Sequence, residues 1–233
     1  MIEVGELFRD IVGGIDKSIN VTAKQNYSID TNYDIHYTCD TKWARVGKTL
    51  FGYDSNGAGI GHIIRGVSTD EYILTDHYYS DHISYALNSP FPIVGTPIST
   101  NIEWTKYSND LTTKTPLIWL LENHTEKVYG LEYSLERDIN MKILFLDETD
   151  ILNYKIEDHR LQVVQPMIKL QEEFIKVIDK NAIYKRLKDF NRDTFSRFGK
   201  ETENGMIKNI LDANLSGIII DISVPKFKDM CKC

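Results

Sequence analysis

The sequence has few of the features that mark secreted, membrane-spanning or nucleic-acid-binding proteins. Its three cysteines, Cys39, Cys231 and Cys233, are too few for a disulfide framework, and the terminal Cys-x-Cys pair lacks two further zinc ligands. A charged-then-apolar leader is missing, and so is an uncharged apolar run of about 18 residues. With 27 basic residues against 34 acidic ones, the formal net charge is −7, so bulk electrostatics will not hold nucleic acid. We expect a protein of the reducing cytosol with no membrane contact and no specific nucleic-acid binding.

Motifs for nucleotide binding and nucleophilic catalysis are incomplete or absent. Residues 47–49 read Gly-Lys-Thr like the end of a phosphate-binding loop, but Lys42 stands where the motif needs its first glycine. The alternate glycines of residues 57–61 do not follow the dinucleotide-binding spacing, and we interpret them as a hairpin tip. The sequence also has no Gly-x-Ser-x-Gly element. We therefore expect no cofactor and no catalytic residue.

Two Asp-His pairs, Asp76-His77 and Asp81-His82, are the best candidates for metal binding or acid–base chemistry. Histidine with carboxylate suits several metals, and ligands five residues apart could converge on one loop. A third group of ligands does not stand out, so a solvated polar loop is the favoured interpretation and we expect no metal site. A metal-dependent hydrolase that uses the Asp76–His82 loop stays open as the weakest alternative.

Hydrophobic periodicity indicates both helices and strands. Apolar residues recur at helical spacing over residues 4–15 and again over 167–178, which predicts two amphipathic helices. Over residues 18–87, polar and apolar residues alternate around a strong turn signal at Asn56-Gly57. This pattern predicts a small antiparallel β-unit, which could act as a barrel that grips a ligand.

Further strands are expected in the second half of the chain. Residues 117–121 and 141–146 are nearly continuous apolar runs typical of buried strands, and 217–224 forms a last strand before Pro225. The polar residues 126–140 between the first two runs could form a hairpin. Residues 183–214 carry mixed charges with little clean periodicity, and we assign them no element.

These elements predict an α+β fold with a helix–sheet–helix–strand core and a β-rich antiparallel insertion. We expect the core to comprise residues 1–17 and 116–225, and the insertion residues 18–87. Residues 88–115, which carry several of the prolines, should form an extended arm, because proline removes an amide donor and fixes φ. Residues 226–233 should form a flexible tail.

The order of the core elements resembles that of the tail terminator, or tail completion, proteins of long-tailed bacteriophages. The matching segments are residues 2–15, 116–121, 140–146, 166–178 and 217–224, while the β-rich insertion departs from the family's pattern. The composition of the sequence, which is acidic and rich in Tyr and Asn, also looks like that of phage structural proteins. The resemblance implies a non-enzymatic virion subunit, found in the host cytoplasm during assembly, that forms a homo-oligomeric ring at the head–tail junction.

The partners implied by this resemblance are copies of the chain itself and other phage tail or neck proteins. Four residues of the proline-containing arm, Phe91, Ile93, Trp104 and Tyr107, are the expected interface anchors, because aromatic and large apolar side chains dominate protein interfaces. A monomeric, barrel-like binding module remains the main alternative.

Overall fold

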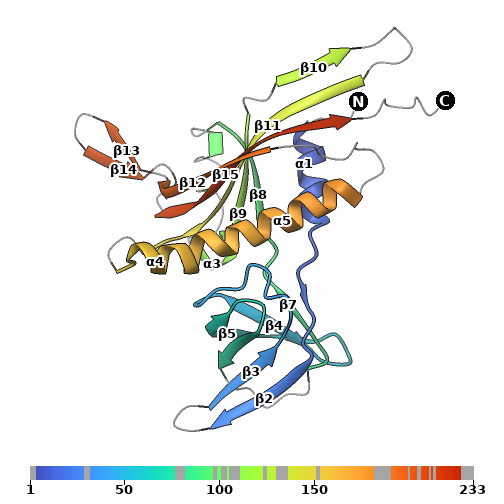
Figure 1. Cartoon of the computed structure of the whole chain (residues 1–233), viewed down its shortest axis with the longest axis vertical. Coiled ribbons are helices and arrows are strands. Elements are labelled where there is room, and N and C mark those ends of the chain that lie inside the picture. The colour runs from blue at the N-terminus through green and yellow to red at the C-terminus, as the bar shows by residue number, and fades with distance from the viewer. Residues whose placement is uncertain are drawn as a thin grey trace, which may run out of the picture.

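The computed structural model shows a chain that is mostly β-structure, built around two large sheets (Figure 1). The structure describes residues 4–28, 32–76, 82–96, 99–100, 104, 111–122, 125–129, 136–150, 153–180, 190–198, 200–203, 206–209, 211 and 214–226. Their strands form a seven-stranded, a six-stranded and a two-stranded sheet, and a single long helix crosses between the two large sheets. The predicted α+β class with a helix–sheet–helix–strand core is therefore wrong.

Two regions account for this correction. The β-rich insertion is a full seven-stranded sheet, so it is as large a layer as the expected core. Residues 190–209, which were assigned no element, form strands β12 (Phe190–Phe198), β13 (Lys200–Glu203) and β14 (Met206–Asn209). The sequences of these strands mix polar and apolar residues without a clear period. Such strands depend on pairing with a neighbouring strand, which sequence periodicity does not reveal.

The six-stranded sheet has the order β12-β15-β11-β9-β8, with β10 paired to β11 beyond the end of β9. Its further strands are β8 (Phe91–Gly95), β9 (Leu117–Leu121), β10 (Thr125–Tyr129), β11 (Glu136–Glu148) and β15 (Leu215–Lys226). The predicted strands at 117–121, 141–146 and 217–224, and the hairpin at 126–140, are thus present. Within the segment predicted as an extended arm, β8 forms an outer strand that runs parallel to β9, where Pro92 is tolerated.

Both predicted amphipathic helices are present and pack on one face of this sheet. They are α1 (Val4–Gly13) and α5 (Gln165–Lys180), and α5 is preceded by α4 (Ile156–His159) and a π-helical segment, η1 (Arg160–Val164). Phe174 of α5 lies against Phe8 of α1 and Phe145 of β11, with ring centroids 6.1 and 5.5 Å apart. On the opposite face of the sheet lies a second core cluster, which includes Trp119. The single-turn helix α3 (Leu111–Lys114) comes shortly before β9 in the sequence. No helix among the described residues is both long and apolar enough to cross a membrane.

The seven-stranded sheet is antiparallel and curls into a half-barrel. Its strands are β1 (Ser18–Ile19), β2 (Ala23–Ser28), β3 (Asn32–Tyr37), β4 (Thr49–Tyr53), β5 (Gly59–Ser68), β6 (Tyr72–Asp76) and β7 (Ser84–Leu87), in the order β1-β7-β4-β5-β6-β3-β2. The first half of β5 pairs with β4 and its second half with β6, with a register shift between Ile64 and Gly66 that bends the strand. The two outer strands, β1 and β2, are joined by residues 20–22 alone, so the two edges must lie near each other. We call the gap between them the open seam.

A buried ion cluster fixes the seven-stranded unit on the six-stranded sheet. Arg45 and Lys48, from the loop before β4, reach Asp147 near the end of β11, with N–O distances of 3.4 and 3.0 Å. Lys48 also donates a hydrogen bond to the hydroxyl of Thr115, and Arg45 Nη1 donates to the carbonyl oxygen of Glu148 at 2.6 Å. The cluster therefore joins the two sheets by specific contacts.

Candidate binding groove at the open seam

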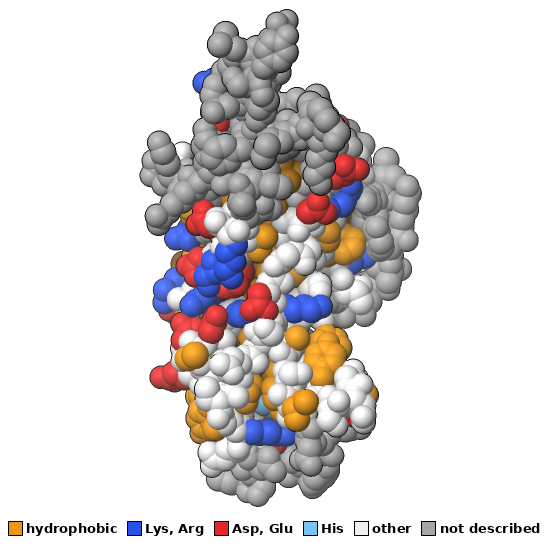
Figure 2. All heavy atoms as spheres, turned by 90° about the vertical axis from the view of Figure 1, so that its right-hand side faces the viewer, with side chains coloured by type: hydrophobic (Ala, Val, Ile, Leu, Met, Phe, Trp, Pro, Cys, Tyr) orange, Lys and Arg blue, Asp and Glu red, His pale blue; other side chains and the backbone are white. Residues whose placement is uncertain are grey.

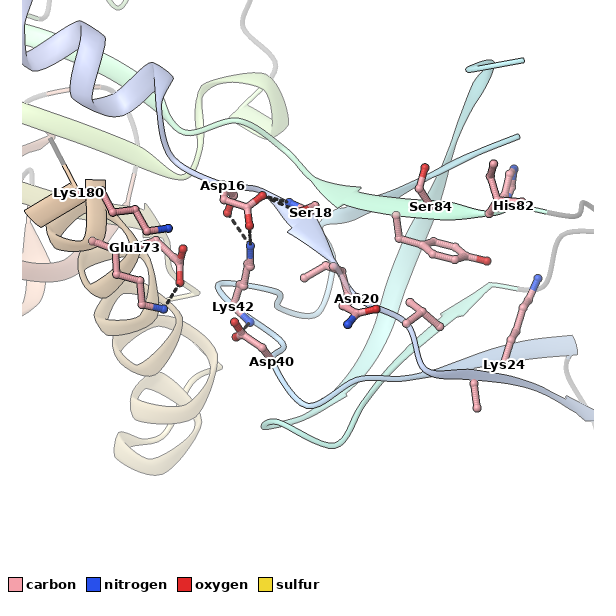
Figure 3. A pocket seen from close by; sticks show the side chains of 16 residues that line it. Asp16, Ser18, Asn20, Lys24, Asp40, Lys42, His82, Ser84, Glu173 and Lys180 are labelled. Atoms are coloured by element: carbon pink, nitrogen blue, oxygen red, sulfur yellow. Dashed lines mark hydrogen bonds and ion pairs between the residues drawn. The ribbon is translucent and has the colours of Figure 1, made fainter. Parts of the chain in front are cut away.

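A groove of about 700 Å³ lies where the open seam faces the second half of α5 (Figure 3). Its lining comes from the segment joining α1 to β2, from residues 82–85 at the start of β7, from the loop after β3, and from α5. The view of this side of the molecule shows basic and acidic side chains mixed at mid-height, above a lower unit with more hydrophobic surface (Figure 2). Charged and polar groups from all four of these segments line the groove.

The wall next to α5 is built from paired charges. Lys42 Nζ lies 2.8 Å from Asp16 Oδ2 and also donates to the carbonyl oxygen of Asp16 at 2.8 Å. The Asp16 carboxylate accepts two further hydrogen bonds, from the backbone N–H and the hydroxyl of Ser18. The hydrogen bonds from Lys42 and then Ser18 hold the pKa of Asp16 at about 2. On α5, Lys176 Nζ donates to Glu173 Oε1 at 2.5 Å, and this hydrogen bond raises the pKa of Lys176.

The wall at the seam covers a buried polar cluster inside the half-barrel. Tyr85 lines the groove but is only 5% exposed, and its hydroxyl has no hydrogen-bond partner among the described residues. Burial raises the pKa of this hydroxyl, and the carboxylate of Asp34 raises it further. Asp34 is itself buried and lies 3.3 Å from Lys24 Nζ, which lines the mouth of the groove. Polar groups thus continue from the groove into the barrel interior.

Two histidines, His36 and His82, lie against Tyr85 in this interior, and a third, His62, lies against His82. The ring centroids of His36 and His82 lie 4.7 and 6.1 Å from that of Tyr85, and His62 Nε2 lies 3.3 Å from His82 Nδ1. His36 Nε2 forms a 3.0 Å hydrogen bond with the Thr75 hydroxyl. Burial is the main cause that lowers the pKa of His36 to about 4, and burial followed by the charge of His82 lowers the pKa of His62. The imidazoles of His36 and His62 are therefore suited to the neutral state in the folded protein.

The described residues of the Asp76–His82 loop, Asp76 and His82, have separate partners and do not converge on one site. Asp76 forms a two-pronged ion pair with Arg65, at 2.7 and 2.9 Å, on the outside of the sheet. His77 and Asp81 lie outside the described residues, while His82 turns toward His62. Within the described part of the chain, no three His, Cys, Asp or Glu side chains are placed to hold a metal ion.

The four predicted interface anchors have different surroundings. Ile93 and Trp104 are buried in the core cluster on the far face of the six-stranded sheet, and Phe91 is partly buried against the same cluster. Lys114 Nζ donates to the carbonyl oxygen of Trp104 at 2.7 Å and lies 4.7 Å from its ring centroid. Tyr107 lies outside the described residues. The described side chains of this set contribute to packing within the chain, and their role at an interface stays a prediction.

Of the residues that line the groove, sequence reasoning singled out His82 as a candidate but missed the charged wall next to α5. Asp16, Lys42 and Glu173 are far apart in the chain and line the same groove only in the folded protein. Lys42 drew attention only as the residue that spoils a phosphate-binding motif. No local spacing in the sequence could have grouped these positions.

Comparisons with protein-family models, with curated proteins and with solved structures found no match.

Proposed function

We propose that the protein is a non-enzymatic structural subunit of a phage virion, which forms a ring with copies of itself. Its place would be that of a tail terminator or neck protein at the head–tail junction, in contact with other tail or neck proteins. The observation that supports this proposal is a three-stranded projection beyond the core. It consists of β10, residues 136–140 of β11 and residues 223–226 of β15 (Figure 1).

The projection offers sheet edges for pairing with another chain. Among the described residues, β12 pairs with β15 only as far as Ile222, and β9 pairs with β11 only as far as Ile143. Among the described residues, β10 has a strand partner on one side only, and so does the end of β15. Unpaired strand edges are templates for main-chain hydrogen bonds with a second chain. Because Pro225 lacks an amide donor, the β10 edge is the better candidate for this pairing.

Light scattering behind size exclusion, over a range of concentrations, tests the proposal. We expect a defined oligomer, seen as closed rings by electron microscopy. Proline substitutions at the neighbouring positions Lys127 and Val128 form a matched pair, because successive N–H groups in a strand point to opposite sides. One variant should stay folded and lose the oligomer, whereas the other should lose the β10–β11 pairing and stability. Oligomers that persist in both variants would exclude the β10 edge.

A second candidate function is a monomeric binding module. The observation that favours it is the groove at the open seam, with a wall of charged side chains and the buried Tyr85. A strict monomer at the highest soluble concentration would favour this function over the ring.

A further inference from the structure

A second groove, of about 560 Å³, lies on another part of the junction between the two sheets. It is formed by residues 41–45, by the turn between β5 and β6, and by the helical residues 161–169. Ala44, Val67, Leu161 and Ile168 give it apolar walls, and Arg45 and Gln165 are among its polar lining. Leu161 belongs to the π-helical segment and is 43% exposed, although it is a large apolar side chain. Single-turn π-helical segments are frequent at functional sites.

The charges behind this groove do not balance. Arg45, Lys48 and Asp147 have side chains that are 8%, 9% and 2% exposed, so two cations and one carboxylate are buried together. Asp147 is the only carboxylate paired with these cations among the described residues, since Glu148 contributes its carbonyl oxygen. A buried cation without a counter-charge is costly, and the cluster keeps one positive charge in excess.

One edge of the Arg45 guanidinium is free for a further acceptor. Nη1 makes the contacts to Glu148 and Asp147, whereas Nε is buried without a hydrogen-bond partner in the described part of the chain. In arginine, Nε–H and one of the terminal N–H groups form the fork that binds a carboxylate in a bidentate manner. Arg45 also lines the groove, so its side chain borders the space in which a guest would lie.

We propose that this groove binds an acidic side chain of a partner polypeptide, with its carboxylate on Arg45 and an adjacent apolar side chain against Leu161. A single excess positive charge matches a carboxylate, which carries one negative charge, better than it matches a phosphate. The other lysines of the rim are already paired, Lys169 with Asp70 at 2.9 Å and Lys42 with Asp16 at 2.8 Å. The apolar walls favour a carboxylate carried by a peptide over a free small anion. The site is separate from the β10 edge, so it stands whether or not the ring forms.

Nuclear magnetic resonance of the arginine Nε–H groups tests the site on the wild-type protein, with the Arg45 signal assigned through Arg45→Lys. The probe is the blocked dipeptide N-acetyl-leucyl-glutamic acid amide, and the matched control is its glutamine analogue. We expect a saturable shift of the Arg45 signal with the glutamate probe, and about tenfold weaker binding of the neutral analogue. Arg65 and Arg160, which are paired on the surface, serve as internal references. Equal effects of both probes, or no saturable shift, would overturn the proposal.

Two further measurements distinguish a carboxylate carried by a polypeptide from a free small carboxylate. Sodium acetate at matched concentrations should bind more weakly than the glutamate probe, and equal affinity would contradict a polypeptide guest. Leu161→Ala should weaken the probe by about threefold, because it removes apolar contact without touching the ion cluster. Ile156→Ala is the matched control, since Ile156 is 90% exposed and does not line the groove. Equal probe affinity in these two variants would also overturn the proposal.

Discussion

Lys48 precedes a strand of the half-barrel and Asp147 lies in the six-stranded sheet, yet their side chains meet at 3.0 Å in the interior. Lys48 comes from the loop before β4 of the half-barrel, and Asp147 from the end of β11 in the six-stranded sheet. Together with Arg45 they form a polar contact between the two sheets, which are also joined by a hydrophobic core cluster with residues from both. The stability of the chain should therefore depend strongly on this one carboxylate.

Asp147→Asn should destabilise the protein by about 3–5 kcal/mol, because it leaves two buried cations without their counter-charge. Urea unfolding at neutral pH measures the effect. The control is Asp221→Asn, which removes a half-exposed ion pair with Lys142 at 3.6 Å and should cost less than about 1 kcal/mol. Equal losses in the two variants would mean that the buried cluster does not hold the sheets together.

The histidines inside the half-barrel should make stability fall with acidification. The pKa of His36 is about 4 in the folded chain, against 6.5 as its ordinary value, and the pKa of His62 is shifted in the same direction. As the pH falls, the unfolded chain therefore takes up protons before the folded chain does. The contribution of His36 to the free energy of unfolding is fully present above pH 6.5 and declines as the pH falls toward 4. The charged and titratable neighbours of His36 are Lys24, Asp34, His62, His82 and Tyr85.

Urea unfolding between pH 7.5 and 4.5 checks this dependence. In His36→Gln, the free energy of unfolding should depend less steeply on pH, because one titrating group is missing. The full pKa shift of His36 corresponds to roughly 3 kcal/mol. Asp16 contributes in a lower window, because its pKa of about 2 lies below its ordinary value of 3.8. An unchanged slope in His36→Gln would show that His36 is not the group that titrates.

The fold class was predicted wrongly, but several single elements could be predicted because burial on one face leaves a period in the sequence. The stripes of α1 and α5 and the apolar runs of β9, β11 and β15 follow directly from such burial. The β-rich insertion was also indicated, by its alternation and by the turn signal at Asn56-Gly57. In these elements, local pattern and tertiary burial agree.

The elements that were missed depend on pairing or on distant contacts. Strands β12 to β14 are polar and charged, and β12 is defined by its register with β15. The ion cluster could not be anticipated either, because Lys48 and Asp147 read as surface charges until the fold buries them. The same holds for the two grooves, whose walls come from segments that meet only in three dimensions.

Alanine in place of glycine should destabilise the protein at Gly217, where another strand is very close, and not at Gly13, where nothing is close. Gly217 has a φ of 155°, and a Cβ atom there would collide with the carbonyl oxygen of Phe145 on the neighbouring strand. Gly217→Ala should therefore destabilise the protein by about 2 kcal/mol or more. Gly13→Ala is the matched control, since nothing surrounds that position at the end of α1 and alanine favours a helix. Thermal unfolding should show a lower Tm for the first variant and an equal or higher Tm for the second.

The buried hydroxyl of Tyr85 should contribute nothing favourable to stability. It has no hydrogen-bond partner among the described residues, so Tyr85→Phe removes a buried polar group without breaking a bond. We expect the free energy of unfolding to stay the same or to rise by about 1 kcal/mol. The control is Thr75→Val, which deletes the hydroxyl bonded to His36 Nε2 at 3.0 Å and should cost about 1–3 kcal/mol. A clear loss of stability in Tyr85→Phe would mean that the hydroxyl does have a partner in solution, such as a buried water molecule.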